Sequence, residues 1–553
     1  MNQFQLNINA IVSGLYHQGL RHVVICPGSR NAPLIMAFAR FEKIKCYSIP
    51  DERSAGFIAL GMAKALKEPV AVLCTSGSAL VNIYPAVLEA FYMQVPLIVI
   101  SADRPLKFID RWDGQTIHQL NVFGEHVLGS FQTNDDLDSS HIQSTFTLVN
   151  DLYQLANGLL KGPVHLNAPL REPLYEAKNE IFIYPEAPVK KTVEKEDSEW
   201  EIGFDGERFF NEYPKVLILL GADDNFDEAP NLLAISKLPY AVVCCDVISN
   251  VHAMNSFQNW DLIFSKANIE ELHLLSPDLL ITSGKMVLNK SLKKLLRTHP
   301  PKQHWHIEIS GYTADPFFSN PQVLTIERKT FFEQFLKFLP QHTSAYYQLF
   351  TDLNAKISLK PIEQDFNEIW AIQIVLKQLP EEAVIHLANS MTIRNFAMLM
   401  SSFKSKWKFF SNRGVSGIDG CTSTALGYAI QNQDLNILFT GDIAFFYDIN
   451  ALWNHYVPNN FKIVLMNNQG GGIFDMIDGS SGLKELNPFI KTPHQMDAQH
   501  LATHFKILYD CVENEVQLNE KLNHFLTSKH CHLLEIKTND QINQTIFKQL
   551  KSK

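Results

Sequence analysis

Two short apolar runs, separated by one amphipathic stretch, stand out in the last quarter of the chain. The first, Ile437-Leu438-Phe439, is followed by Gly441-Asp442, and the second, Ile463-Val464-Leu465-Met466, is followed by Asn467-Asn468. Residues Phe446 to Val457, between the runs, show a helix-like pattern. This succession is typical of a βαβ unit with parallel strands. Because a right-handed crossover brings both strand ends to one edge of the sheet, we expect Asp442 to lie beside the paired asparagines.

The same alternation of strand-like and helix-like segments recurs along the whole chain. It predicts an α/β protein with three doubly wound parallel-sheet domains, over residues 1–183, 202–340 and 365–553. Pro185, Pro188 and a run of charged residues between 184 and 201 indicate a surface linker. The central domain has no glycine-rich dinucleotide fingerprint, so we expect neither NAD nor FAD there.

Polar loops follow the predicted strands of the first domain. In a doubly wound sheet the ligand lies at the carboxyl ends of the strands, so these loops are expected to line one edge. They are Pro27-Gly28-Ser29-Arg30, Asp51-Glu52-Arg53, Thr75-Ser76-Gly77-Ser78, Ala102-Asp103-Arg104-Pro105 and Gly114-Gln115-Thr116-Ile117-His118-Gln119.

Carboxylate and amide oxygens at one sheet edge are ligands of the kind that Mg²⁺ prefers. Magnesium commonly takes few protein ligands and completes its shell with water and phosphate oxygens, so a site this small predicts a phosphorylated ligand. The glycines after Asn468 let the backbone approach that ligand closely. The alternative is that Gly441-Asp442 and the stretch from Asn467 to Gly470 are ordinary turns, but their pairing across a βαβ-sized gap favours a metal site.

The composition and net charge of the chain limit the kinds of partner that the protein can bind. The 553 residues are 46% hydrophobic and 19% charged, which is typical of a globular protein of several domains. A net charge of −10 argues against nucleic acid or an acidic membrane surface as partner. Eight scattered cysteines show neither zinc-ligand spacing nor a disulfide framework. With no apparent signal peptide and no apolar run long enough to span a bilayer, we expect a cytoplasmic protein with buried free thiols.

Glu52 is the candidate acid of the first domain. It follows a predicted strand and precedes a helix-like segment, so Asp51 and Glu52 could simply be acids at a helix N-terminus. The functional alternative is a carboxyl group with a raised pKa in an apolar pocket, which shares a proton with a ring nitrogen of an electron-sink cofactor.

These motifs together resemble a known family. Gly-Asp followed after a crossover by Asn-Asn is similar to the metal signature of thiamine-diphosphate enzymes. The strand-end loops above, with Ser411 to Gly420 and Asn467 to Phe474, resemble the 2-succinyl-5-enolpyruvyl-6-hydroxy-3-cyclohexene-1-carboxylate synthase family of menaquinone synthesis, in order and spacing. The resemblance implies the three-domain fold of thiamine-diphosphate enzymes. It also implies a transferase that decarboxylates 2-oxoglutarate and adds the succinyl carbanion to isochorismate.

The resemblance also implies roles for individual residues. Asp442, Asn468 and the carbonyl of Gly470 would hold Mg²⁺, or Mn²⁺, against the diphosphate. Glu52 would activate the aminopyrimidine, while Ser416 would contact the cofactor and Ile418 would keep it bent. The substrates carry carboxylates, which favour arginine partners. The implied substrate residues are Ser29, Arg30, Arg104, Gln115, Lys290, Ser390, Arg394, Arg413, Ile473, Phe474 and Ile477.

Several positions depart from the family pattern. Ile443 stands in place of the usual glycine after Asp442, Ala444 where a hydroxyl is common, Ser291 where some relatives have a second cation, and Gln469 where a third Asn is frequent. The resemblance further implies a homodimer or a dimer of dimers, with active sites at the subunit interface. The alternatives are another thiamine-diphosphate decarboxylase or acetolactate-synthase-like carboligase, and a non-catalytic regulatory homologue.

Overall fold

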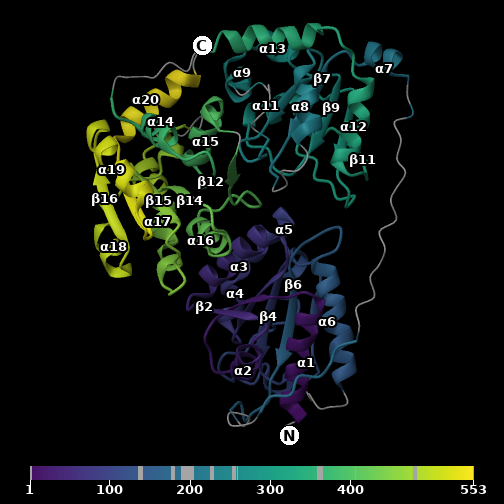
Figure 1. Cartoon of the computed structure of the whole chain (residues 1–553), viewed down its shortest axis with the longest axis vertical. Coiled ribbons are helices and arrows are strands. Elements are labelled where there is room, and N and C mark those ends of the chain that lie inside the picture. The colour runs from purple at the N-terminus through teal and green to yellow at the C-terminus, as the bar shows by residue number, and fades with distance from the viewer. Residues whose placement is uncertain are drawn as a thin grey trace. The chain divides into compact units, whose positions relative to one another are not determined.

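The computed structural model describes residues 3–134, 141–175, 181–188, 203, 205–223, 229–251, 257, 259–357, 365–404, 406–476 and 483–551 (Figure 1). Its strands form three sheets, and the strand pairs with a defined register are parallel. This confirms the predicted α/β class. The limits of the three domains stay a prediction, and most of the expected linker lies outside the described residues. No helix in the described part of the chain is long and apolar enough to cross a membrane.

The chain divides into two compact units, which we describe separately. The first contains residues 1–195, 412–433 and 444–461, and the second contains 196–411, 434–443 and 462–553. The sheet of the first unit has the strand order β2-β1-β3-β4-β6-β5. Its strands are β1 (His22–Ile25), β2 (Lys45–Ser48), β3 (Val70–Cys74), β4 (Leu97–Asp103), β5 (Ser130–Gln132) and β6 (Val164–Pro169).

Helices cover both faces of this sheet. One face packs on apolar residues of α1, α2 and α6, such as Leu15, Phe38 and Leu152. The other face carries α3, which contacts α5 and α16. The helices of this unit are α1 (Gln3–Gln18), α2 (Ala32–Arg40), α3 (Glu52–Leu66), α4 (Ser78–Asn82), α5 (Tyr84–Met93), α6 (Ile142–Ala156) and α16 (Cys421–Gln431).

The second unit contains the other two sheets. The central sheet has the order β11-β10-β9-β7-β8 and is built around buried apolar strands. Its strands are β7 (Val216–Leu220), β8 (Val242–Cys245), β9 (Leu279–Ser283), β10 (Gln303–Ile307) and β11 (Gln322–Leu324). The helices around it are α7 (Gly206–Glu212), α8 (Ala229–Lys237), α9 (Trp260–Lys266), α10 (Ile269–Leu274), α11 (Lys290–Thr298), α12 (Arg328–Phe338) and α13 (Ala345–Ala355).

The third sheet has the order β13-β12-β14-β15-β17-β16. Counted from its own first strand, this is the strand order of the first sheet, as expected of a duplicated fold. Its strands are β12 (Ala383–Leu387), β13 (Trp407–Phe410), β14 (Asn436–Gly441), β15 (Phe461–Asn467), β16 (Leu508–Val512) and β17 (His532–Lys537). Its helices are α14 (Glu368–Gln378), α15 (Met391–Met398), α18 (Gln499–Phe505), α19 (Glu515–Thr527) and α20 (Asp540–Lys551).

The crossover between β14 and β15 differs from the sequence prediction. We expected a helix over Phe446 to Val457, but α17 (Asp442–Tyr447) begins four residues earlier and is followed by a 3₁₀ turn, Ile449–Leu452. Asp442 is the first residue of this helix, and its carboxylate accepts a hydrogen bond from the Ile443 N–H. Asn454 then ends the helical pattern, because its side chain bonds the backbone of Ala451 and Tyr456.

The contact between α3 and α16 in the first unit depends on two glycines. A Cβ on Gly427 would overlap the carbonyl oxygen of Ile58, and a Cβ on Gly61 would overlap that of Thr424. The two helix backbones can therefore approach this closely only while both positions lack a side chain.

We expect Gly427→Ala to lower the free energy of unfolding by about 1–3 kcal/mol, because the added methyl group meets rigid backbone. Thermal and urea unfolding of the purified protein would measure the change. Gly203→Ala is the control, since a Cβ there has no atom within 4 Å. Equal stability of the two variants would contradict the close packing of these helices.

Candidate active site

The carboxylate of Asp442 joins the loops that follow β14 and β15. The side chain is 2% exposed. Its Oδ1 accepts a hydrogen bond of 2.6 Å from the Ile443 N–H, and its Oδ2 accepts one of 3.0 Å from the Gly470 N–H. Residues far apart in sequence thus meet at the carboxyl ends of neighbouring strands, as the apolar pattern predicted.

The two asparagines after β15 have different environments. The Asn467 amide donates hydrogen bonds to the Met496 carbonyl and the Glu535 carboxylate, and its oxygen accepts one from the Gln469 N–H. Asn468 donates to Glu368, but its Oδ1 is buried and has no hydrogen-bond partner among the described residues. Asn467 therefore holds the loop, while Asn468 presents an unpaired oxygen.

The unpaired Asn468 oxygen is a potential ligand for a metal ion beside Asp442. Leaving a buried carbonyl oxygen without a partner costs about 1–3 kcal/mol, which a bound cation would offset. The Gly470 carbonyl accepts from the Gly472 N–H at 3.0 Å and keeps a second lone pair. A carboxylate, an amide oxygen and a backbone carbonyl are oxygen donors of the type that Mg²⁺ prefers. The residues present therefore fit a hard divalent cation.

Glu368, the first residue of α14, orients Asn468. Its Oε1 accepts from the amide of Asn468 at 2.9 Å and from that of Asn543 at 3.3 Å, while its Oε2 accepts from Asn395 at 2.9 Å. Because all three partners are amide donors, each must turn its own oxygen away from Glu368. Burial and the nearby Asp442 carboxylate raise the pKa of Glu368 to about 7.

Burial also raises the pKa of Asp442, against the opposing effect of its backbone donors and of His494. The His494 Nε2 lies 3.3 Å from the Asp442 Oδ2. Two buried carboxyl groups that both resist ionisation would be stabilised in their charged form by a divalent cation.

Glu52 occupies the first position of α3, immediately after β2. The adjacent Asp51 caps the helix, because its carboxylate accepts from the Ser54 N–H at 3.1 Å and also from the Asn450 amide at 2.6 Å. Glu52 is half-buried, and its carboxylate has no hydrogen-bond or ion-pair partner in the described part of the chain. The simple helix-capping interpretation therefore accounts for Asp51 and leaves Glu52 available.

Glu52 lies close enough to two thiols, at the ends of β1 and β3, to affect them electrostatically. Burial raises the pKa of Cys26 and Cys74, and the negative charge of Glu52 adds to both increases. In the order β2-β1-β3, these strands flank the point where the strand order reverses, and this point is where α/β sheets bind ligands.

Two of the expected substrate arginines converge on one acid. Arg30 is 5% exposed and donates to the Leu170 carbonyl at 3.2 Å and to the Glu172 carboxylate at 2.8 Å. The Arg104 Nη1 lies 3.6 Å from the same Glu172 oxygen and 3.4 Å from Asp113, whereas its buried Nε has no partner among the described residues. The guanidinium groups of Arg30 and Arg104 therefore both lie near the Glu172 carboxylate.

Other expected residues lie on loops with unusual backbone conformations. Gln115, Ser390 and Ser416 all have positive φ, between 59° and 75°. The Arg394 guanidinium donates to the Ser390 carbonyl, which ties α15 to the end of β12. Ser29 contacts the Tyr175 hydroxyl at 3.1 Å.

The loop with Arg413, Ser416 and Ile418 is anchored at both ends. The buried Glu89 carboxylate of α5 accepts from the N–H groups of Gly414 and Val415, at 2.7 and 2.9 Å. The Asn412 amide donates to the Gly420 carbonyl and so closes the loop. Ile418 is only partly buried.

The remaining expected residues are less constrained. Lys290 is exposed at the start of α11 and has no ion-pair partner among the described residues. Ile473 and Phe474 are half-buried in the 3₁₀ turn Gly472–Met476. Ile477 lies outside the described residues.

Comparisons with known proteins show which family this chain resembles. The family model described as "Thiamine pyrophosphate enzyme, N-terminal TPP binding domain" matches residues 8–122, which include Glu52. The chain is 38% identical to the 2-succinyl-5-enolpyruvyl-6-hydroxy-3-cyclohexene-1-carboxylate synthase of Cytophaga hutchinsonii, over 97% of each chain. It is 39% identical to the same synthase of Flavobacterium psychrophilum, over 96% of this chain and 95% of the relative, and also 39% identical to that of Flavobacterium johnsoniae, over 96% and 97%.

This chain belongs to the 2-succinyl-5-enolpyruvyl-6-hydroxy-3-cyclohexene-1-carboxylate synthase family. The matches confirm the family that the sequence motifs suggested. The matches extend over nearly the whole chain, so the departures at Ile443 and Ala444 do not change the family assignment.

Sequence reasoning missed several residues that support the candidate loops. Glu368 is the first residue of α14 and Glu89 lies in the middle of α5, and no motif separates either from surface acids. His494 lies in a loop and approaches Asp442 only through folding. The signal that could have found Glu368 is its place directly after the helix-capping Asn367, yet that pattern also suits an ordinary helix start.

We expect Glu368→Gln to weaken divalent-metal binding by about 10–100-fold, the usual effect of losing a residue that orients a ligand. The new amide would place a donor among three amide donors, so Asn468 would lose its fixed orientation. Titration of Mn²⁺ in the presence of thiamine diphosphate, followed by electron paramagnetic resonance, would measure the affinity. Glu382→Gln removes an exposed acid paired with Lys406 and is the matched control. Unaltered Mn²⁺ affinity in Glu368→Gln would refute the orienting role.

Proposed function

We propose that this protein is a thiamine-diphosphate-dependent transferase of menaquinone biosynthesis. It decarboxylates 2-oxoglutarate and adds the remaining succinyl unit to isochorismate, giving 2-succinyl-5-enolpyruvyl-6-hydroxy-3-cyclohexene-1-carboxylate and CO₂. Family membership over nearly the whole chain supports this reaction. The observation that carries it in the structure is the buried, unpaired Asn468 oxygen beside Asp442 and the Gly470 loop.

When bound, thiamine diphosphate supplies the electron sink for decarboxylation. In our proposal Asp442, Asn468 and the Gly470 carbonyl hold Mg²⁺ or Mn²⁺ on its diphosphate. The backbone donors on Asp442 fix that carboxylate before the metal ion binds, so little reorganisation is needed. Ala444 contributes no hydroxyl at this position, so the contacts to the diphosphate depend more on backbone groups.

Glu52 is proposed to hold a proton shared with the aminopyrimidine ring. Its half-buried carboxylate is free of protein partners among the described residues, whereas Asp51 satisfies the helix end. An acid already paired with a cation would donate or share a proton poorly, because the ion pair favours its charged form. Ser416 and Ile418 are proposed to position the cofactor from the loop held by Glu89.

The proposed substrate contacts are charge-assisted. Arg30 and Arg104 would bind a substrate carboxylate in exchange for Glu172, whose side chain is 66% exposed. Arg394, Arg413 and Lys290 would bind other carboxylates. Ser29, Gln115 and Ser390 would supply polar contacts, and Ile473, Phe474 and Ile477 would form an apolar wall.

We also propose a cytoplasmic homodimer, or a dimer of dimers, with active sites at the subunit interface. Co-expression of two inactive chains, Glu52→Gln and Asp442→Ala, would test the shared site. If each site takes Glu52 from one subunit and Asp442 from its partner, mixed dimers contain one intact site and regain activity. Mixed dimers without activity would contradict a shared site.

The direct test of the reaction supplies 2-oxoglutarate with and without isochorismate and follows CO₂ release and product mass. We expect CO₂ in amounts equal to the product only when both substrates are present with thiamine diphosphate and Mg²⁺. Pyruvate is the discriminating control, because an acetolactate-synthase-like enzyme would consume it. Turnover of pyruvate in preference to 2-oxoglutarate would overturn the proposal.

For Glu52→Gln we expect a loss of turnover of about 10²–10⁴-fold, the usual contribution of a positioned acid or base. Binding of thiamine diphosphate should persist, because the metal corner is intact, whereas exchange of the cofactor's C2 proton should slow strongly. Glu68→Gln, at the other end of the same helix, is the matched control. Normal proton exchange in Glu52→Gln would remove Glu52 from the mechanism.

A further inference from the structure

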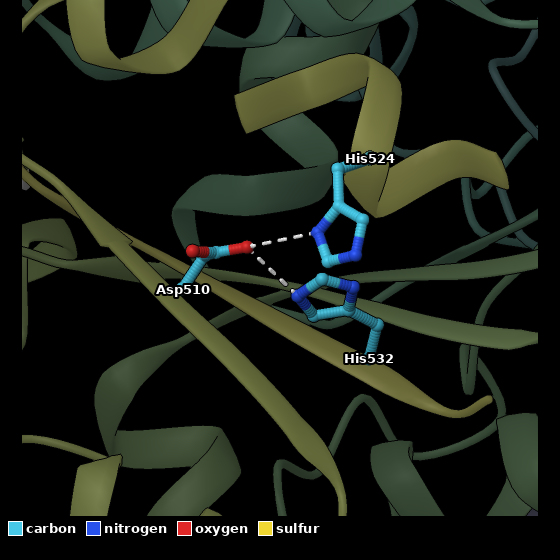
Figure 2. A group of neighbouring side chains, drawn as sticks. All are labelled: Asp510, His524 and His532. Atoms are coloured by element: carbon cyan, nitrogen blue, oxygen red, sulfur yellow. Dashed lines mark hydrogen bonds and ion pairs between the residues drawn. The ribbon is translucent and has the colours of Figure 1, made fainter. Parts of the chain in front are cut away.

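Two histidines and an aspartate meet at the edge of the third sheet. β16 is the edge strand, and its register with β17 pairs Leu508 with His532 and Tyr509 with Leu533. Because side chains alternate along a strand, Asp510 lies on the same face as Leu508 and His532. Helix α19 connects the two strands and brings His524 over this face (Figure 2).

The three side chains point toward one another. The Asp510 Oδ2 lies 3.0 Å from the His532 Nε2 and 3.7 Å from the His524 Nδ1. One potential ligand atom from each residue falls within 4.8 Å of the others. Ligand atoms about 2.0–2.1 Å from a tetrahedral Zn²⁺ are separated by roughly 3.3 Å. Closing the group around such an ion therefore needs the most distant pair of ligand atoms to approach by up to about 1.5 Å.

His524 is the residue that would have to move toward the other two. The His524 side chain is 67% exposed in the last turn of α19, whereas the His532 side chain is fully buried in β17. His532 and Asp510 thus form a fixed pair on adjacent strands, and His524 closes on them from the helix.

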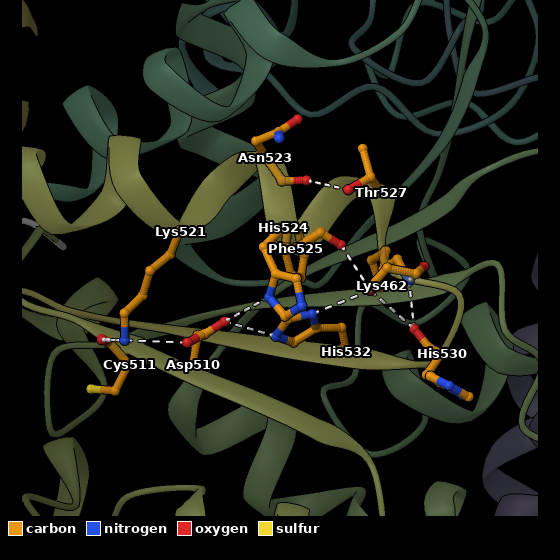
Figure 3. Close-up of polar contacts among 11 residues, drawn as sticks. Lys462, Asp510, Cys511, Lys521, Asn523, His524, Phe525, Thr527, His530 and His532 are labelled. Carbon is orange, nitrogen blue, oxygen red and sulfur yellow. Dashed lines mark hydrogen bonds and ion pairs between the residues drawn. The ribbon is translucent and has the colours of Figure 1, made fainter.

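The other ring nitrogen of His532 is held by Ser528. The His532 Nδ1 lies 3.2 Å from the Ser528 Oγ, which also accepts from Lys462 at 3.0 Å. Lys462 in turn donates to the carbonyl of Ser528. It also donates to the carbonyl of His530 (Figure 3). In the metal-free chain the 3.0 Å contact between Nε2 and the Asp510 Oδ2 is a hydrogen bond, which needs a proton on Nε2. A bound metal ion would replace that proton, and the hydrogen on Nδ1 would then be directed at Ser528, as metal-binding histidines require.

One cation already competes for the aspartate. The Lys521 Nζ lies 3.2 Å from the Asp510 Oδ1 and also donates to the Cys511 carbonyl. It occupies the oxygen that faces away from the histidines, so Oδ2 remains directed at both imidazoles. Its charge would weaken binding of a metal ion without blocking the site.

We propose that Asp510, His524 and His532 form a second metal site, which takes a borderline transition-metal ion such as Zn²⁺. Two imidazole nitrogens and one carboxylate oxygen suit Zn²⁺ or Co²⁺, whereas the all-oxygen corner at Asp442 suits Mg²⁺. The remaining coordination positions face the exposed side of α19 and are open to water. The bound ion would tie the edge strand β16 to α19.

The test uses untagged full-length protein stripped of metal, with excess Mg²⁺ and thiamine diphosphate to fill the other site. Co²⁺ alone is the probe, because a four- or five-coordinate nitrogen-containing site gives stronger visible absorption than an octahedral oxygen site. We expect one Co²⁺ per chain with such a spectrum, displaced by Zn²⁺. Absence of this spectrum in the unaltered protein would overturn the proposal.

Two histidine variants distinguish Co²⁺ binding at the proposed site from nonspecific Co²⁺ binding at the protein surface. His524→Ala should lower Co²⁺ affinity by at least 10–100-fold, a loss no smaller than that from removing an outer partner of a metal ligand. It should keep enzymatic activity, which shows that the fold is intact. His530→Ala removes a neighbouring exposed histidine that only offers its carbonyl, and it should bind as the unaltered protein does. Equal Co²⁺ affinity of His524→Ala and His530→Ala would overturn the proposal.

Lys521→Gln gives an effect of the opposite sign. Removing the ammonium group from Asp510 abolishes the competing charge, so Co²⁺ should bind more tightly than in the unaltered protein. No increase in affinity would contradict Asp510 as a ligand.

Discussion

The candidate metal site depends on the backbone hydrogen bonds to the Asp442 carboxylate, one from the neighbouring Ile443 and one from the separate loop of Gly470. A parallel sheet places the ends of β14 and β15 at the same edge, but this alone does not fix the loops beyond them. The N–H groups of Ile443 and Gly470 do so, because each donates to a different oxygen of Asp442. A buried carboxylate satisfied by backbone donors keeps its orientation, and it can then share its remaining lone pairs with a cation.

Buried acids serve the same purpose elsewhere in the chain. Glu535 accepts from Asn467, Tyr509 and the Ala498 N–H, and so holds the strand end that carries Asn468. Glu89 holds the loop of Ser416 and Ile418 through two backbone N–H groups. In each case a buried carboxyl group, which is unfavourable to desolvate, anchors a loop that has no regular secondary structure. Buried carboxyl groups thus anchor the loops of the candidate site by accepting hydrogen bonds from them.

The sequence predicted what depends on periodicity and order. Apolar runs located the strands around Asp442 and Asn468, and motif order indicated the family that the comparisons confirmed. The edge strands β5 and β11 have only three residues each, too few for an apolar run to identify them. The helix predicted over Phe446 to Val457 was misplaced, because asparagine side chains that bond the backbone outweigh helical periodicity there. Glu368 escaped detection because its role arises from three amides that only folding brings together.

The contrast between Asp51 and Glu52 shows how folding separates adjacent residues with similar chemistry. Both are acids at the start of α3, and the helix dipole would stabilise either of them. Only one side chain can occupy the capping position, and Asp51 takes it while also accepting from Asn450. The longer side chain of Glu52 is left beside the ends of β1 and β3 without a partner in the described structure. Asp51 therefore satisfies the helix start, and the Glu52 carboxyl group keeps no protein partner in the described structure, as the role proposed for it requires.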